Sequence, residues 1–285
     1  MSSTFAPLRV PVFRRFWLAN IASNFGGLVQ AVGAAWMMTL ISNSDALVAL
    51  VQASTTLPIM VFSLIAGAVA DSFDRRRVML LSQLFMLVVA AVLTAFALLN
   101  WLNAWLLLSF TFLIGCGMAF NNPAWQASVR DFVGKDLLPG AVLLNGVGFN
   151  VTRSVAPAIG GTIVAAAGAS VAFLVNAVSY LGLIFAVWSW EGPPRREEKR
   201  REALGPAVLS GFRYISLSPN LKRIFFRGFA FGLTGIVVLA LLPLIARDML
   251  AGDSLTFGLL LGAFGFGAVL GGLSTARISQ TLSSE

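Results

Sequence analysis

Residues 71–99 read DSFDRRRVMLLSQLFMLVVAAVLTAFALL, so that a cluster of charges is followed by a run without a single charge from Val78 to Leu99. A helix needs about 20 apolar residues to cross the hydrocarbon core of a bilayer. The run 78–99 is therefore predicted to span a membrane. The charged cluster before it is predicted to form a turn at the membrane surface.

Apolar runs of similar length recur along the whole chain. Of its 285 residues, 58% are hydrophobic and 11% are charged, whereas a soluble domain carries about 25% charged residues. We therefore predict an all-α membrane protein built as a helical bundle. The other predicted spans are 16–40, 47–70, 104–127, 140–166, 169–190, 224–246 and 256–276.

The placement of lysine and arginine predicts the orientation, because these residues favour the cytoplasmic side of a membrane. With a cytoplasmic N-terminus, all but two of the 20 basic residues fall on that side. The exceptions are Arg153, which lies within a span, and Arg247, which lies on the outer side. We expect a multi-pass protein of the bacterial inner membrane.

Several classes of function are disfavoured by composition. The net charge of +8 could suggest nucleic acid, but the basic residues lie in short gaps between apolar runs and form no basic helix face. Histidine is absent and Cys116, the one cysteine, lies in an apolar run. We expect no enzyme, metal site, cofactor or nucleic-acid partner.

The strongest motif is GAVADSFDRRR, residues 67–77, between the second and third spans. It resembles the loop between helices two and three of major facilitator transporters, from which Ser72 and Asp74 depart. The resemblance implies that this loop clamps the cytoplasmic side of the outward-facing state. Alternatively, the arginines are only anchors at the membrane surface. The matching residues are Gly67, Asp71, Arg75, Arg76 and Arg77.

A second motif, SVAPAIGG at residues 154–161, resembles the helix-five signature of antiporters in that superfamily. Pro157, Gly160 and Gly161 match, and the alternative role for them is ordinary close packing of helices. Stretches 19–37, 121–145 and 210–225 resemble the transmembrane secretion effector group, which includes enterobactin-type siderophore exporters. This resemblance implies efflux, driven by a proton gradient.

The resemblance also implies two six-helix halves, of which the second is incomplete. We expect an N-terminal bundle over 1–190, a cytoplasmic loop over 191–223 and two helices of the second half over 224–285. The loop begins with a mixed-charge run, and residues 203–215 form either an amphipathic surface helix or a plain linker. The chain is expected to stop after helix eight.

Polar residues within the spans are candidates for lining a substrate cavity, because unpartnered polar groups are costly in hydrocarbon. For each amide, the alternative is a hydrogen bond between helices. In the family, the first and fourth helices line the cavity and the fifth lies beside them. The candidates are Asn20, Asn24, Gln30, Asn121, Asn122, Gln126, Asn145, Asn150 and Arg153.

Arg153 is the one clearly intramembrane charge, and it needs a partner such as an anionic substrate, unless it reaches the cytoplasmic surface or ties helices together. None of the spans has a carboxylate near its middle, so a proton-coupling group would lie at a margin or outside the chain. We predict a small-molecule exporter that works by alternating access. The rival is a non-transporting remnant of such a protein.

Overall fold

The computed structural model describes residues 5–190 and 216–281, and every regular element in them is helical. Seven helices of this part are long and apolar enough to cross a membrane, which confirms the predicted all-α membrane fold. A short 3-10 helix, η1 (Ala6–Arg9), precedes them. The seven long helices are α1 (Pro11–Ile41), α2 (Asp45–Ser72), α3 (Arg75–Leu98), α4 (Ala104–Ala167), α5 (Ala169–Trp188), α7 (Pro219–Leu244, continued by the π-helix η2, Ile245–Met249) and α8 (Ser254–Thr281).

Helix α4 contains two of the predicted spans. A straight helix of its 64 residues would be about 96 Å long, roughly three times the thickness of the hydrocarbon core. The chain instead reverses at Gly134, whose φ of 72° lies in the left-handed region that glycine adopts readily. The gap between the predicted spans 104–127 and 140–166 was expected to be a loop. That prediction is wrong, because the helix continues to Gly134 and resumes directly after it.

Helix α7 begins earlier than predicted. It starts at Pro219 instead of 224, because the Ser218 hydroxyl accepts a hydrogen bond from the Leu221 backbone N–H at 3.4 Å and proline suits the first helical turn. The predicted mixed-charge run and the predicted amphipathic helix over 203–215 lie outside the described residues.

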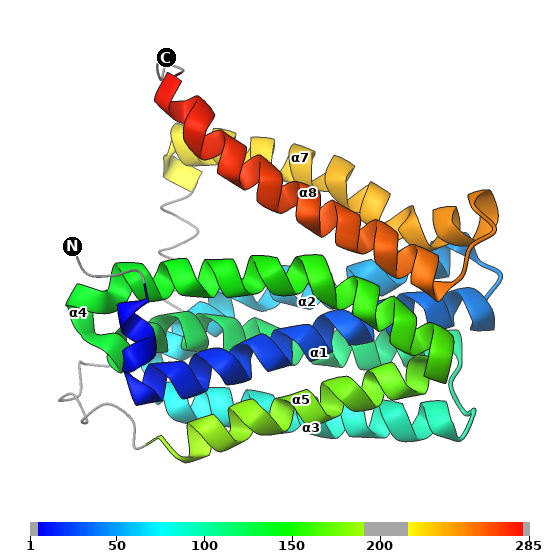
Figure 1. The fold of residues 1–285 in the computed structure, drawn as a ribbon, viewed down its shortest axis with the longest axis horizontal. Helices are drawn as coiled ribbons and strands as arrows, with labels where there is room; N and C mark the ends of the chain where they lie inside the picture. Colours follow the sequence, from blue (N-terminus) through cyan, green and yellow to red (C-terminus); the bar gives the residue numbers. More distant parts are fainter. Residues whose placement is uncertain (1–4, 191–215, 282–285) are drawn as a thin grey trace.

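Helices α1 to α5 form a bundle in which α4 folds back on itself (Figure 1). Helix α8 packs on α4 and α7 packs on α2, so both lie on one side of the bundle, while α3 and α5 lie on the other. We call the end with the α2–α3 turn and Gly134 the arginine-rich end. The other end, with the α1–α2 turn and η2, is called the far end.

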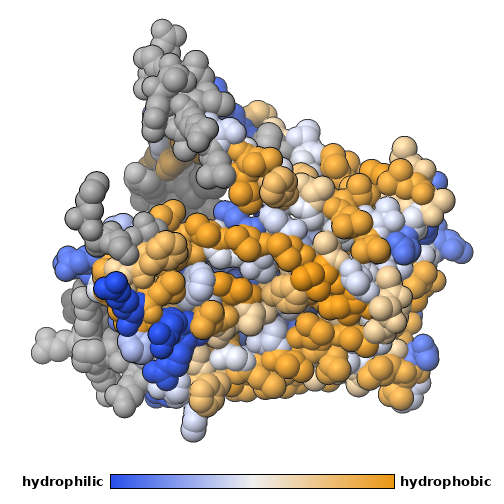
Figure 2. All heavy atoms as spheres, in the orientation of Figure 1, coloured by the Kyte–Doolittle hydropathy of each residue, from blue (hydrophilic) through white to orange (hydrophobic). Residues whose placement is uncertain are grey.

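The bundle has two apolar clusters inside and an apolar surface outside. One cluster is centred on Phe173 and Val29, and the second gathers Phe13, Phe16 and Trp125 at the arginine-rich end. Figure 2 shows hydrophobic residues along the sides of the helices and hydrophilic ones toward the ends. This distribution is expected where lipid is the solvent.

Candidate functional site

The turn between α2 and α3 is fixed by Asp74, a residue that departs from the family pattern. Its Oδ1 accepts hydrogen bonds from the backbone N–H groups of Arg76 (2.9 Å) and Arg77 (3.4 Å), which caps α3. Asp71 is exposed in the last turn of α2, where the helix dipole disfavours a negative charge. No hydrogen bond or ion pair is found for Asp71 within the described residues.

Two arginines of the motif tie α3 to its neighbours. Arg75 Nη1 lies 3.0 Å from Asp131 Oδ2 and donates to the Ala127 carbonyl at 3.0 Å, so it holds the first arm of α4. Arg76 donates to the carbonyls of Val187 (3.1 Å) and Trp188 (2.7 Å) at the end of α5.

The remaining motif residues have looser surroundings. The Arg77 side chain is exposed, and a Cβ added at Gly67 would meet no atom within 4 Å. The described contacts therefore give Arg75 and Arg76 a bracing role beyond that of surface anchors. They do not explain why position 67 is glycine.

Aromatic rings pack together at the arginine-rich end, beside the contacts of Arg75 and Arg76, which we call the brace. The Phe16 and Phe132 rings stack with centroids 4.3 Å apart, and Trp190 meets Phe132 edge-on at 4.9 Å. Residues so distant along the chain give no sequence signal of their contact. The cluster and the Arg76 bonds together fix the C-terminal end of α5.

Two predicted cavity residues form hydrogen bonds between helices. Gln30 is buried, and its side-chain oxygen accepts from Asn176 Nδ2 on α5. Asn176 also donates to Tyr180 Oη at 3.1 Å. Asn121 Oδ1 accepts from Gln83 Nε2 at 3.1 Å, which joins α4 to α3. For Gln30 and Asn121 the structure therefore favours the interhelical role that the sequence left open.

The other candidate amides have no described side-chain hydrogen bond. Asn145 lies next to Leu144, whose carbonyl accepts from Trp17 Nε1 of α1 at 3.1 Å, and Asn145 Oδ1 is buried without a partner. Amide groups left unpaired in a helical bundle would be stabilised by water. The half-buried amides are Asn20, Asn24, Asn122 and Asn145, and the exposed ones are Gln126 and Asn150.

Arg153 lies near the middle of the second arm of α4, about 28 Å from the break at Gly134. This distance is too long for its side chain to reach the surface at the arginine-rich end. Its guanidinium carbon lies 5.7 Å from the centroid of the Phe264 ring on α8. Within the described residues it has no carboxylate partner, so the ring is its only described charge-stabilising contact.

The helix-five motif lies where α4 crosses α8. A Cβ added at Gly161 would lie 2.5 Å from the Ser254 carbonyl, and one at Gly258 would lie 2.4 Å from the Pro157 carbonyl. Gly160 faces Val29 of α1 less closely, with its Cβ position 3.1 Å from the Val29 Cα. The motif thus serves close helix packing in this structure, as its alternative interpretation held.

The contact between α4 and α8 is confined to one part of α8. Gly262 and Gly265 also meet α4, their added Cβ atoms lying 3.0 Å from the Ser154 carbonyl and 2.6 Å from the Arg153 carbonyl. Beyond Gly265, the two helices diverge in Figure 1. Arg153 is therefore at the last close contact before the two helices part toward the arginine-rich end (Figure 1).

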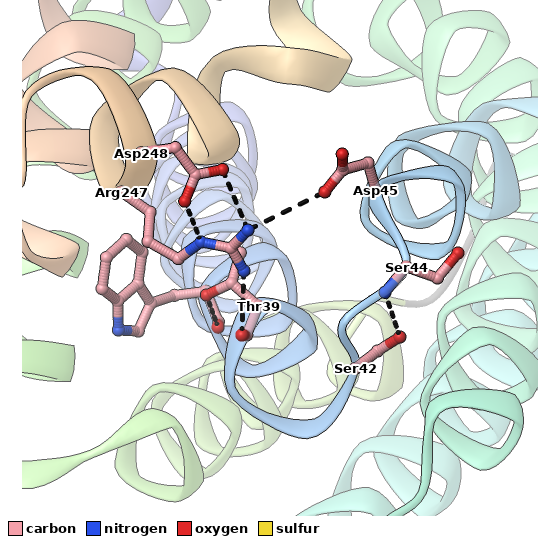
Figure 3. A network of polar contacts seen from close by, with 7 residues as sticks. Thr39, Ser42, Ser44, Asp45, Arg247 and Asp248 are labelled. Carbon is pink, nitrogen blue, oxygen red and sulfur yellow. Dashed lines mark hydrogen bonds and ion pairs between the residues drawn. The ribbon is translucent and has the colours of Figure 1, made fainter.

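A polar network that sequence analysis missed joins the helices at the far end (Figure 3). Arg247 of η2 donates from Nη1 to the Thr39 carbonyl of α1 at 3.2 Å, and its Nη2 lies 3.8 Å from Asp45 Oδ1 of α2. Its Nη2 also donates to Asp248 Oδ2 at 2.9 Å. The sequence did single out Arg247, because it is the one basic residue that the predicted topology places outside the spans on the far side.

Comparison with known proteins covers nearly the whole chain. A family model described as transmembrane secretion effector matches residues 2–285. The staphyloferrin A transporter of Staphylococcus aureus (strain NCTC 8325 / PS 47) is 23% identical over 92% of this chain. The multidrug efflux pump Tap of Mycolicibacterium fortuitum is 27% identical over 93% of it. The chain spans 66% of the length of each of these relatives.

A solved structure shares the fold. The bacterial homologue of the human lysosomal transporter Spinster, in an inward-facing and unoccupied conformation, superposes with a TM-score of 0.72 at 16% identity. The match covers 97% of this chain and 64% of that one. At this level of identity, the similarity establishes the architecture alone.

Proposed function

Because the chain belongs to the transmembrane secretion effector family of major facilitator transporters, we propose that it is a secondary active exporter of small molecules that works by alternating access. The proposed substrates are siderophore-like or drug-like, in keeping with the names of its two relatives. A non-transporting remnant is not favoured by a family match over residues 2–285.

One observation carries this proposal: the helices after residue 216 touch the bundle at the far end and separate from it toward the arginine-rich end. The far end has the Gly161–Gly258 contact and the Arg247 network. Toward the other end, the residues of α7 from Lys222 to Ala230 whose burial is described are all exposed, and α7 and α8 diverge from the bundle (Figure 1). A bundle closed at one end and parted at the other supports one state of an alternating-access cycle.

For orientation, we propose that the arginine-rich end is cytoplasmic and that the protein lies in the inner membrane. The positive-inside rule supports this, since Arg75, Arg76 and Arg77 lie at that end and Arg247 at the other. The parted side then faces the cytoplasm, as in the inward-facing relative of known structure. The proposed domain division has six spans up to residue 190.

For the motif, we propose that Asp71 closes the cytoplasmic side when the transporter faces outward. Its exposed and unpaired carboxylate supports this, because a group without a partner in the parted state is available to pair when the ends approach. Arg75 and Arg76 would hold the turn in place. Opening toward the cytoplasm would then leave the brace intact and break only the contact of Asp71.

For the passage, we propose that the unpaired amides and Arg153 line it, with Arg153 contacting anionic groups of the substrate. Its central depth and lack of a described carboxylate partner support this role. For coupling, we propose protons. In the described spans, acidic residues such as Asp45 and Asp71 occur only near the ends, so a coupling carboxylate among them would be marginal.

The test is efflux from proteoliposomes that contain the whole natural protein, with an imposed pH gradient. Staphyloferrin A and a fluorescent cationic dye would be the two substrates tested. We expect gradient-dependent transport of at least one of them, reduced about tenfold or more in Arg153→Ala and Asp71→Asn variants that fold normally. Absence of transport of both by folded wild-type protein would favour the remnant, and equal transport by all three proteins would remove both residues from the mechanism.

A further inference from the structure

Arg247 connects α7 to two helices of the first bundle. It lies on η2, where the chain passes from α7 into a π-helix shortly after Pro243. Its Nη1 bonds to the Thr39 carbonyl in the last turn of α1, and its Nη2 faces Asp45, the first residue of α2. Among the described residues, the contact between Arg247 and Asp45 is the only ion pair between η2 and the first bundle.

The chemistry of each partner suits a guanidinium. The last carbonyls of a helix have no partner within the helix and carry the negative end of its dipole, so Thr39 is a favourable acceptor. Asp248 bonds to the same guanidinium through Oδ2 at 2.9 Å and holds its plane. Arginine offers several donors in one rigid fork, which lets it contact three segments at once.

The backbone on either side of Arg247 lies in apolar, closely packed surroundings. Ala246, next to Arg247, is fully buried, and Leu244 belongs to the cluster that contains Met38 and Val48. The wide turn of η2 is closed by the Gly252 N–H, which donates to the Ala246 carbonyl at 2.8 Å. The backbone that carries Arg247 is thus held against the ends of α1 and α2.

We infer that Arg247 is a gating residue for transport: a latch that keeps the far end closed and must break for that end to open. Its side chain is 30% exposed and that of Asp45 is 71% exposed. Pairs this exposed are weak and screened by salt, so the latch shifts the equilibrium between states without blocking the change. The inference rests on the proposed alternating access, but its test does not require transport.

The experiment measures the distance between the two parts directly. Spin labels would be placed at Leu98, the last residue of α3, and at Leu250, after η2, both exposed. The Cys116→Ala background removes the one native thiol, and the whole natural protein is studied in nanodiscs. In the Arg247→Ala variant, we expect the ratio of long to short distances to rise about threefold to tenfold.

Arg227→Ala is the matched control, because it removes an exposed arginine from the arginine-rich end of α7. We expect it to leave the distance ratio unchanged. Arg247→Lys keeps the charge and loses the fork, and we expect a smaller shift. An unchanged ratio in folded Arg247→Ala, or an equal shift in both alanine variants, would overturn the inference.

A salt titration of protein that retains Arg247 guards against misfolding of the Arg247 variants. In an Asp71→Asn background, which lacks the proposed cytoplasmic contact, raising salt should increase the long-distance population if an exposed ion pair holds the far end, and no response would count against the latch. Transport measured on the samples that retain Asp71 separates the two proposals. A distance shift in protein that transports neither tested substrate supports the latch and contradicts the proposed function.

Discussion

The crossing of α4 and α8 makes a quantitative prediction for Gly258. A methyl group added there would lie 2.4 Å from the Pro157 carbonyl oxygen and 2.9 Å from the Gly161 Cα. Carbon–oxygen contacts are normally about 3.3–3.6 Å, so the helices must separate by about 1 Å. Both neighbours are backbone atoms, which cannot rotate away as a side chain can.

The cost of Gly258→Ala follows from this geometry. Overpacking of this kind costs about 1–3 kcal/mol, and the separation also loosens the nearby contacts of Gly262 and Gly265. For a protein of this size, each 1 kcal/mol corresponds to about 2–4 °C in Tm. We therefore expect a Tm lower by about 2–12 °C.

Gly267→Ala is the matched control, since it adds the same methyl group to the same helix where nothing lies within 4 Å. Its Tm should stay level or rise, because alanine favours helix by up to about 1 kcal/mol. Thermal unfolding in mild detergent, followed by tryptophan fluorescence, measures both variants. Equal Tm values for the two would refute the close crossing.

Three further predictions concern stability. Arg76→Ala should lower the free energy of unfolding, measured in urea, by about 1.5–3 kcal/mol, because two charged hydrogen bonds to α5 are lost. The control Arg77→Ala removes an exposed side chain and should change it by less than about 0.5 kcal/mol. Equal losses in the two variants would contradict the role of Arg76 in holding α5. Asn176→Ala should cost about 1–3 kcal/mol by leaving the buried oxygen of Gln30 unpaired, and an unchanged urea midpoint would argue against that bond. At Asp253, a hydrogen bond from the Thr256 backbone N–H lowers the pKa of the carboxyl, so its cap stabilises α8 above the ordinary carboxyl pKa near 4 and is lost as the pH falls through the lowered value. The hydrogen-exchange protection factor at the start of α8, which is the intrinsic exchange rate at each pH divided by the measured rate, should therefore fall in acid, and a pH-independent protection factor would contradict the cap.

Much of the fold could be predicted from the sequence, because apolar length determines membrane spans directly. The span predicted after Arg77 is such a local feature, and the structure contains it as α3. The sharp reversal of α4 was not predicted, since residues 128–139 mix charged and apolar types as a loop would. Only the backbone conformation of Gly134 distinguishes the two possibilities.

The candidate site was less predictable, because its contacts join residues far apart in the chain. Gln30 meets Asn176 across 146 positions, and Arg247 meets Thr39 across 208. Composition shows that buried amides need partners but does not identify them. Asp74 was noted only as a departure from a pattern, although an aspartate directly before a helix is a common cap.

The proposed transport passage requires that the half-buried amides face water. In a Cys116→Ala background, Asn24→Cys on α1 would be compared with Val88→Cys, which is 59% exposed on α3. A membrane-impermeant maleimide is added to inside-out vesicles that contain the whole natural protein. We predict rapid labelling at position 24 and almost none at position 88; equal labelling of the two, or protection of position 24 alone, would contradict a water-filled passage open at the arginine-rich end.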